Sequence, residues 1–193
     1  MSLNTTPMRA ARRLPGRLLR NARATAAVEF ALMLPLMLFV FVGAAQVGQA
    51  IEISRKVTVT TRIVTDLVTQ YSNLSCTTLS TVLAASAQVI APYSVNNLTI
   101  TVSEISTASN KATMVWTATQ SDAGTATCTT PSSNFTLPSQ LLQSSSSAIY
   151  YIYGQVSYAF TPVLGYKIIG TTNIKDQIYM SPRLTTSISY TGS

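Results

Sequence analysis

The feature that most constrains this chain of 193 residues is an uncharged apolar run near its N-terminus. No Asp, Glu, Lys or Arg occurs in the 22 positions from Phe30 to Ile51. A helix rises about 1.5 Å per residue, so the run spans roughly 33 Å, enough to cross a hydrocarbon core of about 30 Å. We therefore predict one transmembrane helix over residues 25–51.

Basic side chains gather on one side of this run. Upstream of Thr25 the chain has no acidic residue and six arginines: Arg9, Arg12, Arg13, Arg17, Arg20 and Arg23. Lys and Arg beside a membrane helix are retained in the cytoplasm. We therefore predict a basic cytoplasmic leader over residues 1–24, and export of everything that follows the helix.

The leader also accounts for the net charge of +7. From Thr25 onward the chain has seven basic and six acidic residues, so the rest is close to neutral. That part has no basic patch with interleaved aromatic residues, which nucleic-acid-binding domains carry. Nucleic acid is therefore not expected among the partners.

Glu29 stands at the start of the apolar run. A carboxylate costs about 2.5–3.5 kcal/mol near the centre of a membrane helix and less toward the interface. Two interpretations are open on the residues alone. The side chain snorkels to the headgroups, or it pairs with a cation such as an amino terminus created by cleavage just upstream.

The residues around Glu29 form a recognisable pattern. Ala26-Ala27-Val28-Glu29-Phe30-Ala31-Leu32 is followed by Pro35 and then by Phe41-Val42-Gly43. This segment, Arg23 to Gly48, resembles the N-terminus of the TadE-like pseudopilins, minor components of the tight-adherence pilus, which is related to type IV pili. Within the segment, Ala27 and Ala31, and Ala44 and Gly48, are spaced to let helices approach closely, although small residues are also common in membrane helices.

The resemblance implies cleavage by a prepilin peptidase between Ala24 and Thr25, which makes Glu29 the fifth mature residue. Ala24 stands where the family usually has glycine. Glu29, next to Phe30, is implied to pair with the new amino terminus of its own or a neighbouring chain and to set the register between helices. Pro35, inside the helix, is expected to kink or locally melt it.

Partners and location follow from the same resemblance. The implied partners are the prepilin peptidase, other minor pilins, the major pilin, the inner-membrane assembly platform and the lipid bilayer. The implied location is the bacterial inner membrane, crossed once, with an exported domain that also reaches the cell exterior in the pilus.

Two other readings remain open. The basic segment, the apolar run and Gly43-Ala44-Ala45 before Gln46 also satisfy an ordinary secretory signal, although Glu29 and Pro35 argue against it. The chain can also be a membrane-anchored or secreted binding domain or enzyme unrelated to pili.

Cys76 and Cys128 both fall on the predicted exported side. An even pair in an oxidising compartment predicts a disulfide, worth about 4 kcal/mol on the chain-entropy account. Two thiols without any histidine do not make a zinc site, so neither a metal nor a cofactor is expected.

The residue pattern of the exported part predicts an α+β fold. Apolar residues recur at helical spacing at Ile51, Val57, Ile63 or Val64, Leu67, Val68 and Tyr71, so we expect the helix to continue through residues 52–72, ending near Tyr71. A second short helix is a candidate between Thr78 and Val89.

A β-rich domain over residues 73–193 is predicted after the helix. Alternation indicates strands at Leu98–Ser103 and Ala112–Ala118 joined by a Ser109-Asn110 turn, and further strands at Tyr150–Phe160 and Ile174–Met180, with Leu184–Tyr190 a candidate fifth. The Ser- and Thr-rich stretch 121–148 is expected to be a loop. A long N-terminal helix packed on a small antiparallel sheet is the pilin plan.

Catalysis finds little support in these residues. The chain has no histidine, which excludes the usual serine triads. The exported carboxylates are few and scattered, so no acid–base pair is indicated. We therefore expect a protein that is not an enzyme.

Overall fold

The computed structural model describes residues 22–162 and 170–192. The chain forms two compact units, residues 1–46 and 47–193. The described part of the first unit is helical, and its helix α2 (Ala22–Thr69) continues into the second unit. The basic leader up to residue 21 lies outside the described residues.

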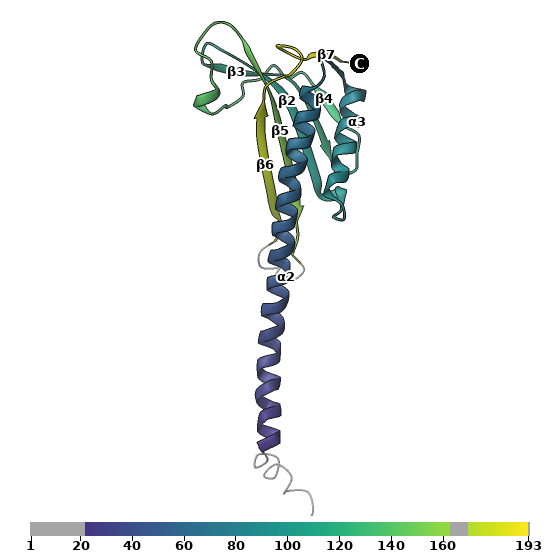
Figure 1. Cartoon of the computed structure of the whole chain (residues 1–193), viewed down its shortest axis with the longest axis vertical. Coiled ribbons are helices and arrows are strands. Elements are labelled where there is room, and N and C mark those ends of the chain that lie inside the picture. The colour runs from purple at the N-terminus through teal and green to yellow at the C-terminus, as the bar shows by residue number, and fades with distance from the viewer. Residues whose placement is uncertain (1–21, 163–169, 193) are drawn as a thin grey trace, which may run out of the picture. The chain divides into compact units, whose positions relative to one another are not determined.

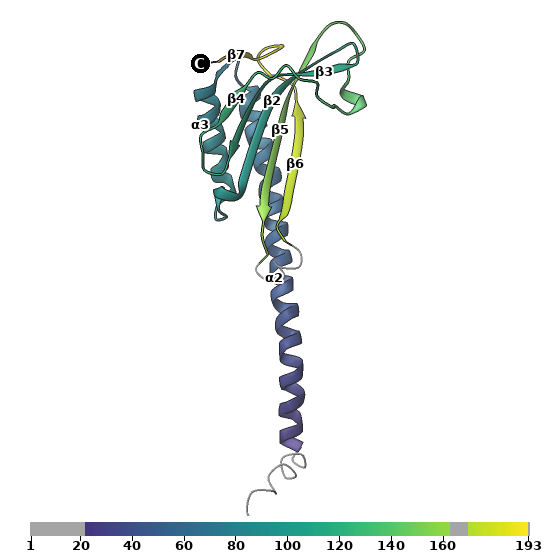
Figure 2. The same cartoon turned by 180° about the vertical axis from the view of Figure 1, so that it is seen from behind.

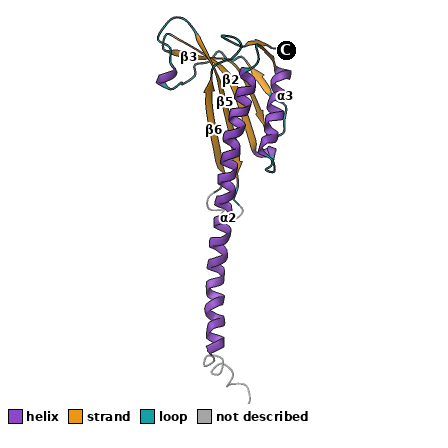
Figure 3. Ribbon diagram, in the orientation of Figure 1, coloured by secondary structure: helices purple, strands orange, loops and turns teal. Residues whose placement is uncertain are grey.

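The second unit is built on a five-stranded antiparallel sheet with the strand order β4-β3-β2-β5-β6, seen in Figure 1 and coloured by secondary structure in Figure 3. The strands are β2 (Leu98–Ala108), β3 (Lys111–Ser121), β4 (Thr127–Thr129), β5 (Ile149–Phe160) and β6 (Thr172–Met180). The predicted α+β class, with a long N-terminal helix and a small antiparallel sheet, is confirmed.

The hairpin between β2 and β3 has the turn expected from the sequence. Ala108 pairs with Lys111, leaving Ser109 and Asn110 as the two turn residues, with φ of 50° and 59°. Two consecutive left-handed residues match the right-handed twist of the flanking strands, and asparagine tolerates that conformation well.

Two helices cover one face of the sheet: the part of α2 from Val47 onward, and α3 (Cys76–Ala87) (Figure 1). Seen from behind, the sheet lies in front of the helices and no helix covers its other face (Figure 2). The inward side of α2 is formed by Ile53, Val57, Val64 and Val68, all buried. This spacing of four and seven residues places one side of the helix on the sheet.

Not all of the apolar residues that recur at helical spacing in α2 are buried. Ile51 and Leu67 are exposed by 51% and 37%. The inward positions between the apolar ones are instead occupied by threonines, including Thr61 and Thr65, whose hydroxyls donate to the carbonyls of Val57 and Thr61. Because these hydroxyls are satisfied within the helix, threonine can be buried there as a small side chain.

Strand β5 approaches α2 closely at Gly154. A Cβ atom added to Gly154 would lie 1.8 Å from Oγ1 of Thr65. Glycine is therefore required here by the contact between strand and helix.

The C-terminal segment does not form the candidate fifth strand over Leu184–Tyr190. Residues 183–187 are bends, and only β7 (Ser189–Thr191) is a strand. It pairs in parallel with β1 (Asn73–Ser75), which directly follows the turn after α2. This pairing joins distant parts of the chain, so local alternation does not reveal it.

The predicted loop over 121–148 contains two short elements, strand β4 and the 3-10 turn η3 (Ser139–Leu141). The loop covers part of the helix-free face of the sheet. Leu137 packs there in a small cluster with Ile105, Ala112 and Tyr153. Two further 3-10 turns, η1 (Gln88–Ile90) and η2 (Val95–Asn97), connect α3 to β2.

Candidate membrane and assembly site

The N-terminal half of α2 presents apolar side chains to its surroundings. From Thr25 to Gln46 no side chain is buried, and Phe30 and Phe41 are exposed by 63% and 72%. The best 18-residue window of the helix has a mean hydropathy of 2.2, and none of it is buried by the chain. So large an apolar surface is stable only against lipid or other proteins. By length and composition, α2 is the one helix in the described residues that can cross a membrane.

Thr25 and Glu29 lie one turn apart on this helix, so they share a face. The Glu29 carboxylate has no hydrogen bond or ion pair within the described residues. The bond between Ala24 and Thr25 lies close to Ala22, the first described residue of α2.

The small residues of this half are not explained by packing within the chain. A Cβ atom added at Gly43, or at Gly48 just beyond this half, would meet no atom within 4 Å. Helix α2 also includes Pro35 and stays helical on both sides of it, so the helix is not melted there. A kink at Pro35 stays a prediction.

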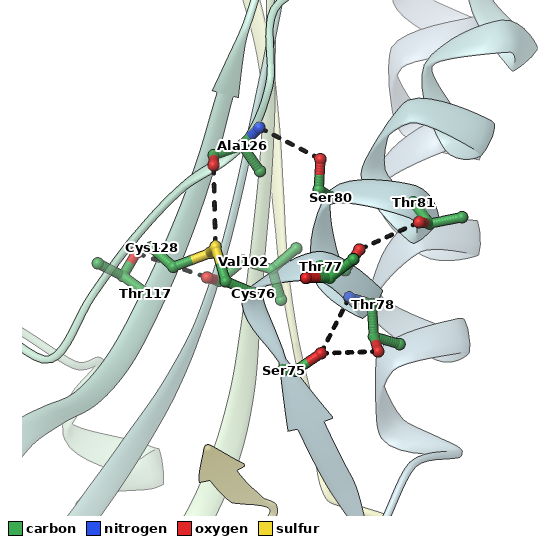
Figure 4. The surroundings of a disulfide bond; sticks show 10 residues. All are labelled: Ser75, Cys76, Thr77, Thr78, Ser80, Thr81, Val102, Thr117, Ala126 and Cys128. Atoms are coloured by element: carbon green, nitrogen blue, oxygen red, sulfur yellow. Dashed lines mark hydrogen bonds between the residues drawn. A yellow bond between two sulfur atoms is a disulfide. The ribbon is translucent and has the colours of Figure 1, made fainter. Parts of the chain in front are cut away.

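The predicted disulfide is present. Cys76, the first residue of α3, is bonded to Cys128 of β4 across 52 positions of sequence (Figure 4). Ser75 caps α3 by accepting a hydrogen bond from the Thr78 amide at 3.2 Å. The bridge ties the start of this helix to the edge strand β4. Disulfides persist in oxidising compartments, so the bridge fits an exported unit.

Glu104 has a structural role that was not predicted from the sequence. It is fully buried, and no cation in the described residues pairs with it. Its Oε2 accepts from Nε1 of Trp116 at 2.8 Å, and its Oε1 accepts from the Ile188 amide at 2.7 Å. Burial raises the pKa of the Glu104 carboxyl, and the two hydrogen bonds oppose that rise.

This carboxylate fastens the C-terminal segment to the sheet. Ile188 directly precedes β7, and Tyr190 within β7 stacks on Trp116 at a ring-centroid distance of 6.0 Å. The sequence did hold a signal for Glu104. Along β2 the inward residues alternate, and Glu104 occupies the next inward position after Ile100 and Val102.

Comparison with known proteins supports the resemblance noted from the sequence. Residues 24–63 match the family model of TadE-like proteins. No curated protein and no solved structure matches the chain. The TadE-like resemblance is thus confirmed over the segment that contains Thr25, Glu29 and Pro35. It indicates a protein associated with the tight-adherence pilus, and hence one that interacts with other pilus components.

The match covers the whole apolar half of α2 and most of its packed half. The single apolar helix is compatible with a single-pass anchor in a pilus protein. Among the residues that the structure describes, no group of three His, Cys, Asp or Glu side chains is placed to hold a metal ion.

Proposed function

We propose that this protein is a minor pilin or pseudopilin of a tight-adherence pilus and acts in filament assembly or at the filament tip. The observation that carries the proposal is the TadE-like match over residues 24–63. Two features support it. The apolar half of α2 is not buried by any of the described residues, and the remainder of the same helix is part of a disulfide-bonded α+β unit.

In this proposal a prepilin peptidase cuts between Ala24 and Thr25. The arginine leader stays in the cytoplasm until the cut, and the unit from Val47 onward is exported. The new ammonium group on Thr25 then pairs with Glu29 of its own or a neighbouring helix. A single buried polar pairing of this kind sets the axial register of packed helices.

The lipid bilayer holds the subunit until the inner-membrane assembly platform passes it into the filament. There its apolar half packs against the major pilin and other minor pilins. Gly43 and Gly48 leave room for those helices to approach. No catalytic step is assigned to the chain.

The mature N-terminus tests this proposal directly. Intact-mass measurement and N-terminal sequencing of the protein from its native membrane are expected to give a chain that starts at Thr25. A start at Gln46 would identify a secretory signal. An uncut chain would identify a plain membrane anchor, and either result would contradict the proposal.

A further inference from the structure

A cavity of about 340 Å³ lies between the tip of the β2–β3 hairpin and the loop that joins β4 to β5. Its volume falls in the range of about 300–1,000 Å³ that is usual for ligand pockets. It belongs entirely to the unit from Val47 onward. Any function assigned to it is therefore independent of the membrane helix and of the proposed role in the pilus.

The walls of the cavity are held in place by backbone hydrogen bonds. On the hairpin side, the amides of Ser109 and Asn110 donate to the carbonyls of Ser145 and Gln143, both at 2.8 Å. On the loop side, the Phe135 amide donates to the carbonyl of Ala112 at 2.9 Å. Both walls are thus fixed before a ligand arrives, which reduces the entropy lost on binding.

The cavity combines a hydrogen-bonding rim with an apolar floor. Asn110, Asn134 and Thr136 supply two amides and a hydroxyl; these side chains are exposed, and none of them has a hydrogen bond within the described residues. The floor is made by Phe135 and Leu142, and the Phe135 ring is held against the Tyr153 ring at a centroid distance of 5.1 Å.

Such a mixture suits a sugar ring. A sugar presents hydroxyl groups around its edge, which amides can both donate to and accept from, and C–H groups on its faces, which pack on apolar and aromatic side chains.

The positive charge of Lys111 at the cavity favours an anionic ligand over a neutral one. Lys111 is the only charged residue that lines it; it is exposed, and no acidic group in the described residues pairs with it. We propose that this cavity binds an acidic sugar residue of a glycan, with Lys111 facing the sugar carboxylate and Asn110 and Asn134 holding its hydroxyls.

The test uses the full chain in detergent micelles and the hyaluronan tetrasaccharide, which alternates glucuronate with N-acetylglucosamine. Chitotetraose is the matched neutral sugar, and acetate is the matched carboxylate without a ring. Saturation-transfer NMR and calorimetry are expected to show binding of the acidic tetrasaccharide, weaker binding of chitotetraose, and no competition by acetate.

Lys111→Gln and Asn134→Ala are each expected to weaken the binding of the acidic sugar about fivefold. Lys111→Gln should also remove the preference over chitotetraose. Lys175→Gln on the edge strand β6 is the matched control, because it removes an exposed lysine away from the cavity and should change nothing.

Near-ultraviolet circular dichroism establishes that each variant folds. Three results would overturn the proposal: no binding of either sugar at millimolar concentration, binding unaltered by both cavity variants, or competition by acetate equal to that of the sugar. A peptide segment of another protein found in the cavity would overturn it as well.

Discussion

The two halves of α2 belong to one uninterrupted helix, yet they differ in what surrounds them. From Val47 to Thr69 the inward side chains are buried by the sheet of the same chain, and buried threonine hydroxyls bond to helix carbonyls. From Thr25 to Gln46 no side chain is buried. The packed half is thus explained by the chain itself, whereas the apolar half requires lipid or other subunits.

This difference predicts where substitutions act. Changes in the packed half and in the sheet beneath it should lower the stability of the unit formed by residues 47–193. Changes in the apolar half should leave that stability unaltered and affect only insertion or assembly.

The largest effect is expected from removing the disulfide. The Cys76→Ser, Cys128→Ser double variant should lower the free energy of unfolding of the folded unit by about 4 kcal/mol, because the unfolded chain loses a long covalent loop. Denaturant unfolding followed by tryptophan fluorescence measures it, since Trp116 is the single tryptophan and is fully buried. Reduced wild-type protein should behave like the variant, and an unchanged unfolding midpoint on reduction would refute the prediction.

A smaller effect is expected at the contact between helix and strand. Gly154→Ala should cost about 2–3 kcal/mol, because the new methyl group would overlap Oγ1 of Thr65. Adding Thr65→Ala should recover part of this loss, since it removes the overlapping oxygen. The same unfolding measurement tests both variants.

Gly43→Ala is the matched control in the apolar half. A Cβ atom there meets nothing in the chain, so the stability of the folded unit should not change. Equal losses for Gly154→Ala and Gly43→Ala would contradict the division of α2 into a packed and an unpacked half.

The sequence was most informative where the pattern is local. The β2–β3 hairpin was predicted correctly because alternation and a Ser109-Asn110 turn are read from adjacent residues. The membrane-length run needed only length and the absence of charge. The pairing of Cys76 with Cys128 was predicted because the chain has only two cysteines.

It was least informative where distant segments meet. The parallel pairing of β1 with β7 joins residues more than a hundred positions apart, and the segment 184–190 was wrongly considered as a full strand. The apolar spacing did not define the inward face of α2, because buried threonines occupy that face beside the apolar residues. The buried role of Glu104 was not predicted, because Glu104 was counted among the scattered acids. The alternation along β2 would have placed it on the inward side of the strand.

Glu104 predicts how the stability of the folded unit depends on pH. Because burial raises its pKa, the folded state binds a proton more tightly than the unfolded state does. The contribution of Glu104 to stability is then complete below its unfolded pKa of about 4.5 and is lost as the pH rises through the raised folded value. This group therefore favours the fold more at mildly acidic pH than at pH 7.

Glu104→Gln removes this titration while retaining one carbonyl acceptor. Subtracting the unfolding free energy of the variant from that of the wild type, at a series of pH values, isolates the contribution of the group. The unfolding free energy of the wild type should fall relative to that of the variant as the pH rises from 4.5 to 7. A flat difference would show that the carboxyl titrates as it does in the unfolded chain, and one of opposite sign would show that folding lowers its pKa; either result would contradict the prediction.

The smallest effect on stability, and the largest on assembly, is expected at Glu29. This carboxylate has no hydrogen bond or ion pair within the described residues, so Glu29→Ala should change the unfolding free energy of the folded unit by no more than about 0.5 kcal/mol. It should also retain membrane insertion, which losing a charge favours. If Glu29 meets the amino terminus of Thr25 after cleavage, the variant should be cut normally but form few filaments.

The matched control is Glu52→Ala, an acid on the same helix within the packed half. Its carboxylate accepts a hydrogen bond from the exposed Tyr93 hydroxyl at 2.8 Å, a contact inside the subunit. Filaments counted by electron microscopy should therefore be normal for Glu52→Ala and scarce for Glu29→Ala. Normal filaments in both would remove the register role of Glu29, and scarce filaments in both would mean that the packed half also faces other subunits.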